Sequence, residues 1–157
     1  SVRADYLSFN EDGTIKKVIP TKRGVGLVEA KSKIQIDRYS AASAAGVSVS
    51  FLDPANKSEG WKISFNGTNA WASFNDVDFG KGQFNFVNVR SDSSTGGSIE
   101  IHLDKMGGPL LAQVEIGKGS AWKTIKSQLA SAPTGVHNLV VLQPENHEVD
   151  LDWISFE

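Results

Sequence analysis

Cysteine is absent from the 157-residue sequence, methionine occurs once and histidine three times. The lack of cysteine excludes thiol nucleophiles, thiolate metal sites and disulfides, and it leaves the cellular compartment open. No apolar run approaches the roughly 18 residues that a membrane span needs, and no basic-then-apolar leader opens the chain. With 16 basic and 18 acidic residues the net charge is only −2. We therefore expect neither nucleic acid nor a membrane as a partner.

Sequence motifs for catalysis are also missing. The chain has no Gly-x-Ser-x-Gly elbow, no His-Glu-x-x-His pair and no phosphate-binding Gly-x-x-x-x-Gly-Lys stretch. A glycosidase uses two carboxylates across the scissile bond, and pairs such as Asp150 and Asp152 are candidates for them. An alternating chain rich in acidic residues also produces such pairs as solvated strand faces. The sequence thus favours a protein that is not an enzyme, with a small glycosidase or lyase as the weaker alternative.

What the chain does have is alternation of apolar and polar residues from residue 34 onward. Residues 61–65, 99–103 and 149–153 show the two-residue period of strands with one buried face. Glycine-containing turns such as Asn66-Gly67 separate these runs, and evidence for helices is thin. About eight to ten short strands at even spacing predict an all-β fold, a β-sandwich of the jelly-roll type.

The first 27 residues differ from the rest. Two apolar stretches flank an Asp12-Gly13 turn, which predicts a hairpin, and a linker-like segment from Pro20 to Gly26 follows. We therefore divide the chain into residues 1–27 and a jelly roll over residues 28–157. An edge hairpin of the same sandwich is the alternative.

Oxygen-bearing side chains and tryptophans are the remaining signals. Gln35 and Asp37 are two residues apart, as are Asp150 and Asp152, which suits a Ca²⁺ site between neighbouring strands or, alternatively, plain solvated faces. Trp61 and Trp122 follow polar, glycine-containing segments. An exposed indole there can stack on the C–H face of a sugar, with partly buried packing as the alternative.

Six segments, in order, resemble the motifs of family 6 carbohydrate-binding modules, which are jelly rolls appended to polysaccharide-degrading enzymes. They are IQIDRYS (34–40), WASFNDVDFG (71–80), GSIEIHLD (97–104), GPLLA (108–112), GVHNL (135–139) and DLDWISF (150–156). The stretch YLSFNEDGTI (6–15), followed by Pro20-Thr21, resembles the C-terminal tail of a family 43 glycoside hydrolase, a family that includes xylosidases and arabinofuranosidases.

These resemblances imply a non-catalytic module that directs a catalytic domain of the same polypeptide to plant cell-wall polysaccharide, with xylan or its oligosaccharides as first candidate. They also imply a monomer that works outside the cell or in the cell envelope. A structural domain that has lost its sugar site is the alternative, because Ser50 and Ala70 stand where the family commonly has Glu and Asp.

The resemblance also implies particular residues. Trp61 and Trp122 are expected to form two walls of a cleft at the loop end of the jelly roll, with a concave sheet face as the alternative site. Asn146, or His147 in its place, is expected to reach the sugar hydroxyls. Gln35, Asp37 and Asp152 are expected to bind one structural Ca²⁺, completed by backbone carbonyls of the loop at residues 56–60.

Overall fold

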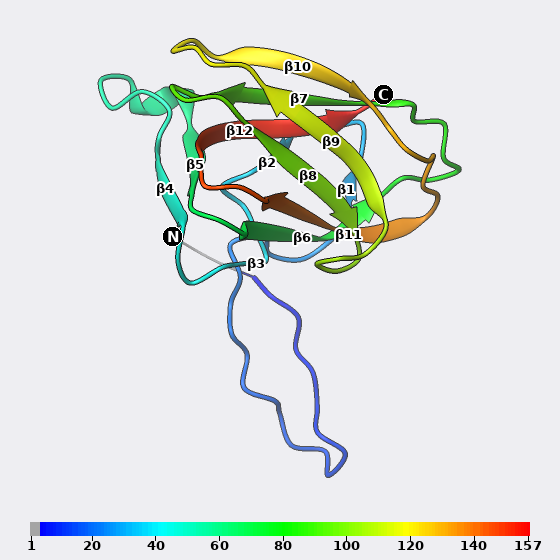
Figure 1. Cartoon of the computed structure of the whole chain (residues 1–157). Coiled ribbons are helices and arrows are strands. Elements are labelled where there is room, and N and C mark those ends of the chain that lie inside the picture. The colour runs from blue at the N-terminus through cyan, green and yellow to red at the C-terminus, as the bar shows by residue number, and fades with distance from the viewer. Residues whose placement is uncertain (1–3) are drawn as a thin grey trace.

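The computed structural model describes residues 4–157 and builds them into two sheets that pack face to face (Figure 1). The first sheet contains β1 (Val28–Glu29), β3 (Ala41–Ala42), β6 (Ala70–Asp78), β8 (Gly97–Leu103), β9 (Leu110–Ile116) and β11 (Val136–Gln143). The second contains β2 (Ile34–Gln35), β4 (Val47–Phe51), β5 (Trp61–Asn66), β7 (Phe86–Asp92), β10 (Lys123–Gln128) and β12 (Glu148–Phe156).

The strand order shows many crossovers between the sheets. The first sheet runs β1-β6-β11-β8-β9, with β3 also on β6, and the second runs β10-β7-β12-β5-β4, with β2 also on β12. Between β4 and β5 lies a single 3₁₀ turn, η1 (Lys57–Glu59). The predicted all-β sandwich is confirmed. Within residues 4–157 no helix is long and apolar enough to cross a membrane.

One hydrophobic core fills the space between the sheets. The alternating residues of both sheets meet there, and its largest fully buried aromatic side chains are Phe65, Phe74 and, at the far end of the sandwich, the mutually packed Phe79 and Phe156. Burial of a side chain of this size contributes about 1.5–3 kcal/mol, so the core holds the polar outer faces in fixed positions.

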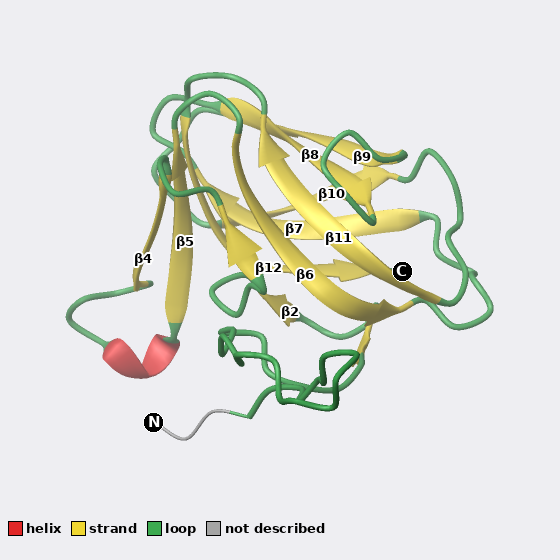
Figure 2. Ribbon diagram, turned by 90° about the horizontal axis from the view of Figure 1, so that it is seen from below, coloured by secondary structure: helices red, strands yellow, loops and turns green. Residues whose placement is uncertain are grey.

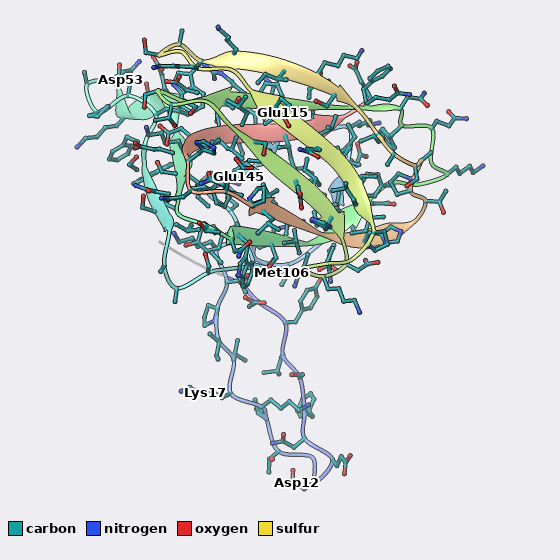
Figure 3. All side chains as sticks on the ribbon, in the orientation of Figure 1. Asp12, Lys17, Asp53, Met106, Glu115 and Glu145 are labelled. Carbon is teal, nitrogen blue, oxygen red and sulfur yellow. The ribbon has the colours of Figure 1, made fainter. Side chains whose placement is uncertain are left out.

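The segment before β1 is an arm that leaves the sandwich (Figure 1, blue). Residues 4–20 form a hairpin closed by a bridge between Phe9 and Ile15. Asp12 marks its tip, far from Glu115 and Glu145 on the sandwich (Figure 3). The large apolar side chains of the arm are exposed to fractions between 38% and 77%: Tyr6, Leu7, Phe9, Ile15, Val18 and Ile19. Residues 1–3 of the expected N-terminal segment lie outside the described residues.

The root of the arm is hydrogen-bonded to the sandwich. The Arg23 guanidinium donates to the carbonyl oxygens of Asn75 (3.1 Å) and Asp76 (3.4 Å) on β6. The Asp5 carboxylate accepts the Thr21 N–H at 2.6 Å, which joins the two legs of the hairpin. The arm therefore leaves the sandwich from a fixed point.

The first and last strands of the sandwich, β1 and β12, end side by side. The N–H of Phe156, at the end of β12, donates to the carbonyl of Ala30, just after β1, at 2.9 Å. At another margin, β4 and β5 form a two-stranded ribbon that ends in η1 (Figure 2).

Candidate functional site

The two tryptophans expected to bind sugar lie at different places on the second sheet. Trp61 is the first residue of β5, is 42% exposed and stacks on Phe51 of β4, with ring centroids 3.9 Å apart. Trp122 directly precedes β10 and is half-buried. The Arg90 guanidinium of β7 lies 5.5 Å from the centre of the Trp122 ring, a cation–π contact.

Strand alternation assigns the two indoles to opposite faces of this sheet. Trp61 is in phase with the buried Ile63 and Phe65, so it lies on the core-facing side, beyond the end of the core. Trp122 contacts Arg90, which stands between buried neighbours on β7 and therefore points outward. The structure does not bring Trp61 and Trp122 together as two walls of one cleft, and sugar binding by each remains a prediction.

A hollow opens on the outer face beside Trp122. It is lined by the end of β7, the loop before β10 and the start of β12, through the residues Asp92, Ser93, Ser94, Ser120, Glu148 and Asp150. Strand register places Asp150 opposite Asp92 on one side and opposite Ser64 on the other. The hollow thus lies at one end of the sandwich, where polar side chains of β7, β12 and two loops converge.

The hollow has unused hydrogen-bonding capacity. The Asp150 carboxylate accepts hydrogen bonds from the Lys62 ammonium and the Ser64 hydroxyl. By contrast, one buried carboxylate oxygen of Asp92 has no partner. Such groups cost free energy unless a ligand or water satisfies them. A hydroxyl-rich ligand stacked on an aromatic ring fits this arrangement.

Asn146 and His147 lie in the loop between β11 and β12, immediately before Glu148 of the hollow. Asn146 is exposed, whereas His147 is half-buried and its Nε2 lies 3.0 Å from a carboxylate oxygen of Glu145. Gly97, with φ of 148°, leaves room for this loop, because a Cβ there would lie 2.9 Å from the Cβ of His147. Both residues therefore border the same end of the sandwich as Trp122.

Sequence reasoning did not find Asp92, Lys62, Ser64 or Arg90. Each is an ordinary polar residue on an alternating strand, and only the register between β7, β12 and β5 places them on one surface. Asp150 was visible as half of a same-face pair with Asp152. A β-bulge between Leu151 and Trp153 intervenes, and Asp152 is 4% exposed and belongs to a different cluster.

That second cluster contains the expected metal ligands. Gln35 pairs with Trp153, and the Ile36 N–H donates to the Asp152 carbonyl at 3.0 Å, which places both expected segments together. One Asp152 carboxylate oxygen accepts a hydrogen bond from Arg90 at 2.7 Å. No cluster of three or more His, Cys, Asp or Glu side chains suited to a metal ion occurs within residues 4–157.

The electrostatics of this cluster suit a cation. Burial raises the pKa of Asp37, against the opposing charges of Arg38 and Lys22. Burial also raises the pKa of Asp152, and the negative charge of Asp37 adds to this effect, whereas Arg90 opposes it. Two partly desolvated carboxylates that repel each other, together with an amide oxygen, are hard oxygen ligands of the kind that Ca²⁺ takes. The residues present fit the ion, with Gln35 supplying no charge.

Comparison with known proteins agrees with this fold. The model of the family "Carbohydrate binding module (family 6)" matches residues 29–157. The chain belongs to this family of non-catalytic β-sandwich modules. A curated relative, an arabinoxylan arabinofuranohydrolase of Paenibacillus polymyxa, is 27% identical over 150 residues. The match covers 90% of the chain and 23% of the relative, so the chain spans about a quarter of its length.

Solved structures separate the sandwich from the arm. A family 6 module from Clostridium cellulolyticum in complex with xylose has a TM-score of 0.72 and 26% identity, over 83% of this chain and 99% of its own. Module CsCBM6-3 of Clostridium stercorarium, with cellobiose, has a TM-score of 0.74 and 22% identity over 84% and 97%. A family 43 arabinoxylan arabinofuranohydrolase from Bacillus subtilis, with cellotetraose, matches 97% of this chain and 33% of its own, with a TM-score of 0.73 and 19% identity.

Proposed function

We propose that the jelly roll binds plant cell-wall polysaccharide, namely xylan or its oligosaccharides, for a family 43 glycoside hydrolase domain of the same polypeptide. The observation that carries this proposal is the hollow beside the half-buried Trp122, whose lining includes Asp92 with an unpartnered carboxylate oxygen. Stacking of one pyranose ring on the indole leaves the sugar hydroxyls free to bond to Asp92 and to Asn146 or His147. The module does no chemistry and raises the local substrate concentration for its enzyme.

The N-terminal segment supports the link to a hydrolase. The modules from the two Clostridium species cover 83–84% of the chain, whereas the Bacillus subtilis hydrolase covers 97%. Residues 1–27 are accordingly proposed as the tail of a preceding hydrolase domain, which would bury the apolar arm. The working protein would be a monomer outside the cell or in the cell envelope, where xylan is found.

A structural Ca²⁺ at Gln35, Asp37 and Asp152 is part of the proposal. Its role would be to tie β2 to β12 and to neutralise two carboxylates whose pKa values burial raises. Backbone carbonyls from residues 56–60 would complete its coordination. The ion would stabilise the fold and take no part in sugar contacts.

Isothermal titration with xylohexaose tests the sugar site. We expect binding by the wild-type chain and its loss at the outer-face hollow in Trp122→Ala, since removal of a stacking ring costs about 1–3 kcal/mol by analogy with base stacking. Trp122→Phe keeps a flat ring and should retain part of the affinity. A wild-type chain that gives no heat with xylan oligosaccharides would favour the second candidate, a structural domain without a sugar site. Ser50 and Ala70 support this candidate, because they stand where the family commonly has Glu and Asp. Release of reducing sugar from xylan by the chain would contradict the non-catalytic function.

A further inference from the structure

A pocket of basic character lies where the root of the arm meets the sandwich. Its lining comes from the arm root, from β1 and from the segment around β2: Arg23, Val28, Lys33, Ile34, Gln35 and Arg38. Three of these side chains are cationic and none is acidic. The pocket has a volume of about 110 Å³, which is several times the space that one water molecule needs. This basic pocket therefore has room for a small ion, and its charge favours an anion.

Ion pairs do not cancel the charge of the basic pocket. Within residues 4–157, no carboxylate forms an ion pair with Arg23, Lys33 or Arg38. The Lys33 ammonium lies 4.6 Å from the centre of the Trp153 ring, a contact that leaves its charge in place. Three carboxylates act on these cations from outside the pocket: Asp37, Asp76 and Asp152. Residues 16–38 as a whole carry seven basic and two acidic side chains, so the surroundings of the pocket are basic as well.

Arg23 is fixed in position before any ligand binds. Its Nε donates to the Asn75 carbonyl at 3.1 Å, and its Nη2 lies 3.4 Å from the carbonyl oxygens of Gly26 and Asp76. Its other terminal nitrogen, Nη1, has no acceptor among the residues that the structure describes. Burial lowers the pKa of Arg23, because desolvation disfavours the cation, and the negative charge of Asp76 opposes this effect. A partly desolvated guanidinium with an unused N–H group is suited to an oxyanion.

The number of cations decides the class of anion. Guanidinium and ammonium groups bind phosphate and carboxylate oxygens through charge-assisted hydrogen bonds. A carboxylate or a halide carries one negative charge and leaves two of the three cations uncompensated. A divalent oxyanion compensates two, and its four oxygens can accept from Arg23, Lys33 and Arg38 together, with the Gln35 amide as a further donor. A neutral sugar compensates none of the charge.

We propose that the basic pocket binds one small divalent oxyanion, of the phosphate or sulfate class, between Arg23 of the arm root and Lys33 and Arg38 of the sandwich. The proposal is independent of the sugar site, because no residue of the hollow beside Trp122 lines the basic pocket. The bound anion joins the arm root to the segment around β2. Occupancy therefore stabilises the folded chain and protects the backbone of the root, including the Gly24 N–H, which donates to the Thr21 hydroxyl at 3.1 Å.

The experiment titrates sodium sulfate into the wild-type chain at constant ionic strength, with sodium chloride as the balancing salt. A calcium-free buffer keeps the result independent of the proposed calcium site. We expect calorimetry to give one sulfate per chain and, at about 10 times Kd, a rise in Tm of about 3–6 °C. Hydrogen exchange of the Gly24 amide should slow in parallel. Sodium phosphate, titrated in the same way, shows which of the two oxyanions binds more tightly.

Substitutions locate the anion. Lys33→Gln and Arg38→Gln each remove one charge from an exposed side chain, and each should weaken sulfate binding at least about 10-fold. Lys105→Gln removes the same charge from the exposed turn between β8 and β9 and is the matched control, with wild-type affinity expected. All three variants should bind xylohexaose as the wild type does, so a failure of the anion site leaves the proposed function untouched.

Three results would overturn the proposal. The first is the absence of saturable heat with sulfate and phosphate, together with an equal Tm in sulfate and in chloride. The second is equal sulfate affinity in Lys33→Gln, Arg38→Gln and Lys105→Gln, since the anion then acts elsewhere or through its general exclusion from protein surfaces. The third is sodium acetate that binds as tightly as sulfate, which would show that one negative charge is enough.

Discussion

Asp37 and Asp152 are the residues at which the proposed calcium site is open to test. Their charges are partly desolvated and repel each other, so a bound Ca²⁺ stabilises the folded chain. At a free Ca²⁺ concentration 100 times Kd the gain is about 2.7 kcal/mol, which raises the Tm of a domain of this size by about 5–10 °C. Thermal denaturation in chelator and in Ca²⁺ measures this shift.

Three variants make the calcium prediction specific. Asp37→Asn should abolish the Ca²⁺-dependent rise in Tm, and Gln35→Glu should enlarge it, because a third carboxylate raises the charge of the site. Glu11→Gln, on the exposed arm, should behave as wild type. An equal rise in wild type and Asp37→Asn would place the ion elsewhere.

The residue scale also shows why the sugar site could be predicted only in part. The sequence places Trp122, Asn146 and His147 in loops that adjoin β10 and β12, and sugar binding by these residues remains a prediction. It cannot assign a face to Trp61, since the phase of β5 follows from its pairing with β4 and β12. The cross-strand partner Phe51 was invisible for the same reason.

Among the elements, the arm depends on pH at its root. Hydrogen bonds from the Thr21 and Tyr6 N–H groups stabilise the ionised Asp5 carboxylate and hold its pKa below the usual 3.8. This contribution is complete above pH 3.8 and is lost as the pH falls through the lowered pKa. We therefore expect the protection factor of the Thr21 amide, measured by hydrogen exchange, to decrease below pH 3.8.

Asp5→Asn is the control for the arm. An amide side chain accepts more weakly than a carboxylate, so the variant should show low protection of Thr21 at pH 7 and little change on acidification. Strong protection in the variant at neutral pH would mean that the root is held by Arg23 and β6 without help from Asp5.

The strands themselves follow closely from the sequence. Alternation at residues 61–65, 99–103 and 149–153 predicts β5, β8 and β12, which the structure confirms, and the apolar-rich residues 136–142 lie in β11 between β6 and β8. The sequence of residues 123–130 is compatible with a helical turn and with a strand. Hydrogen-bonded pairing with β7 makes residues 123–128 a strand, β10, although the local sequence does not determine this conformation.

At the scale of the whole molecule, arm and sandwich should behave as separate units. A chain that begins at Thr21 keeps the Arg23 contacts to β6, and among residues 4–20 it removes large apolar side chains that are exposed. We expect its unfolding free energy in urea to stay within about 1 kcal/mol of the full chain, and its xylohexaose affinity to be unchanged. Its light scattering at high concentration should be lower, since exposed apolar surface promotes association. A loss of several kcal/mol would show that the arm belongs to the sandwich.

The hydrogen bond between Phe156 and Ala30 holds the first and last strands of the sandwich together, so the chain enters and leaves the sandwich at neighbouring points. Such a unit can be spliced into a surface loop of a host protein without stretching either junction. It can equally be circularly permuted. A short peptide would join residues 157 and 28, and the new termini would lie in the exposed β8–β9 turn at Met106. For protein engineering, the sandwich can therefore be inserted into a host protein through its ends near Ala30 and Phe156, and Trp122 then stays on the outer face.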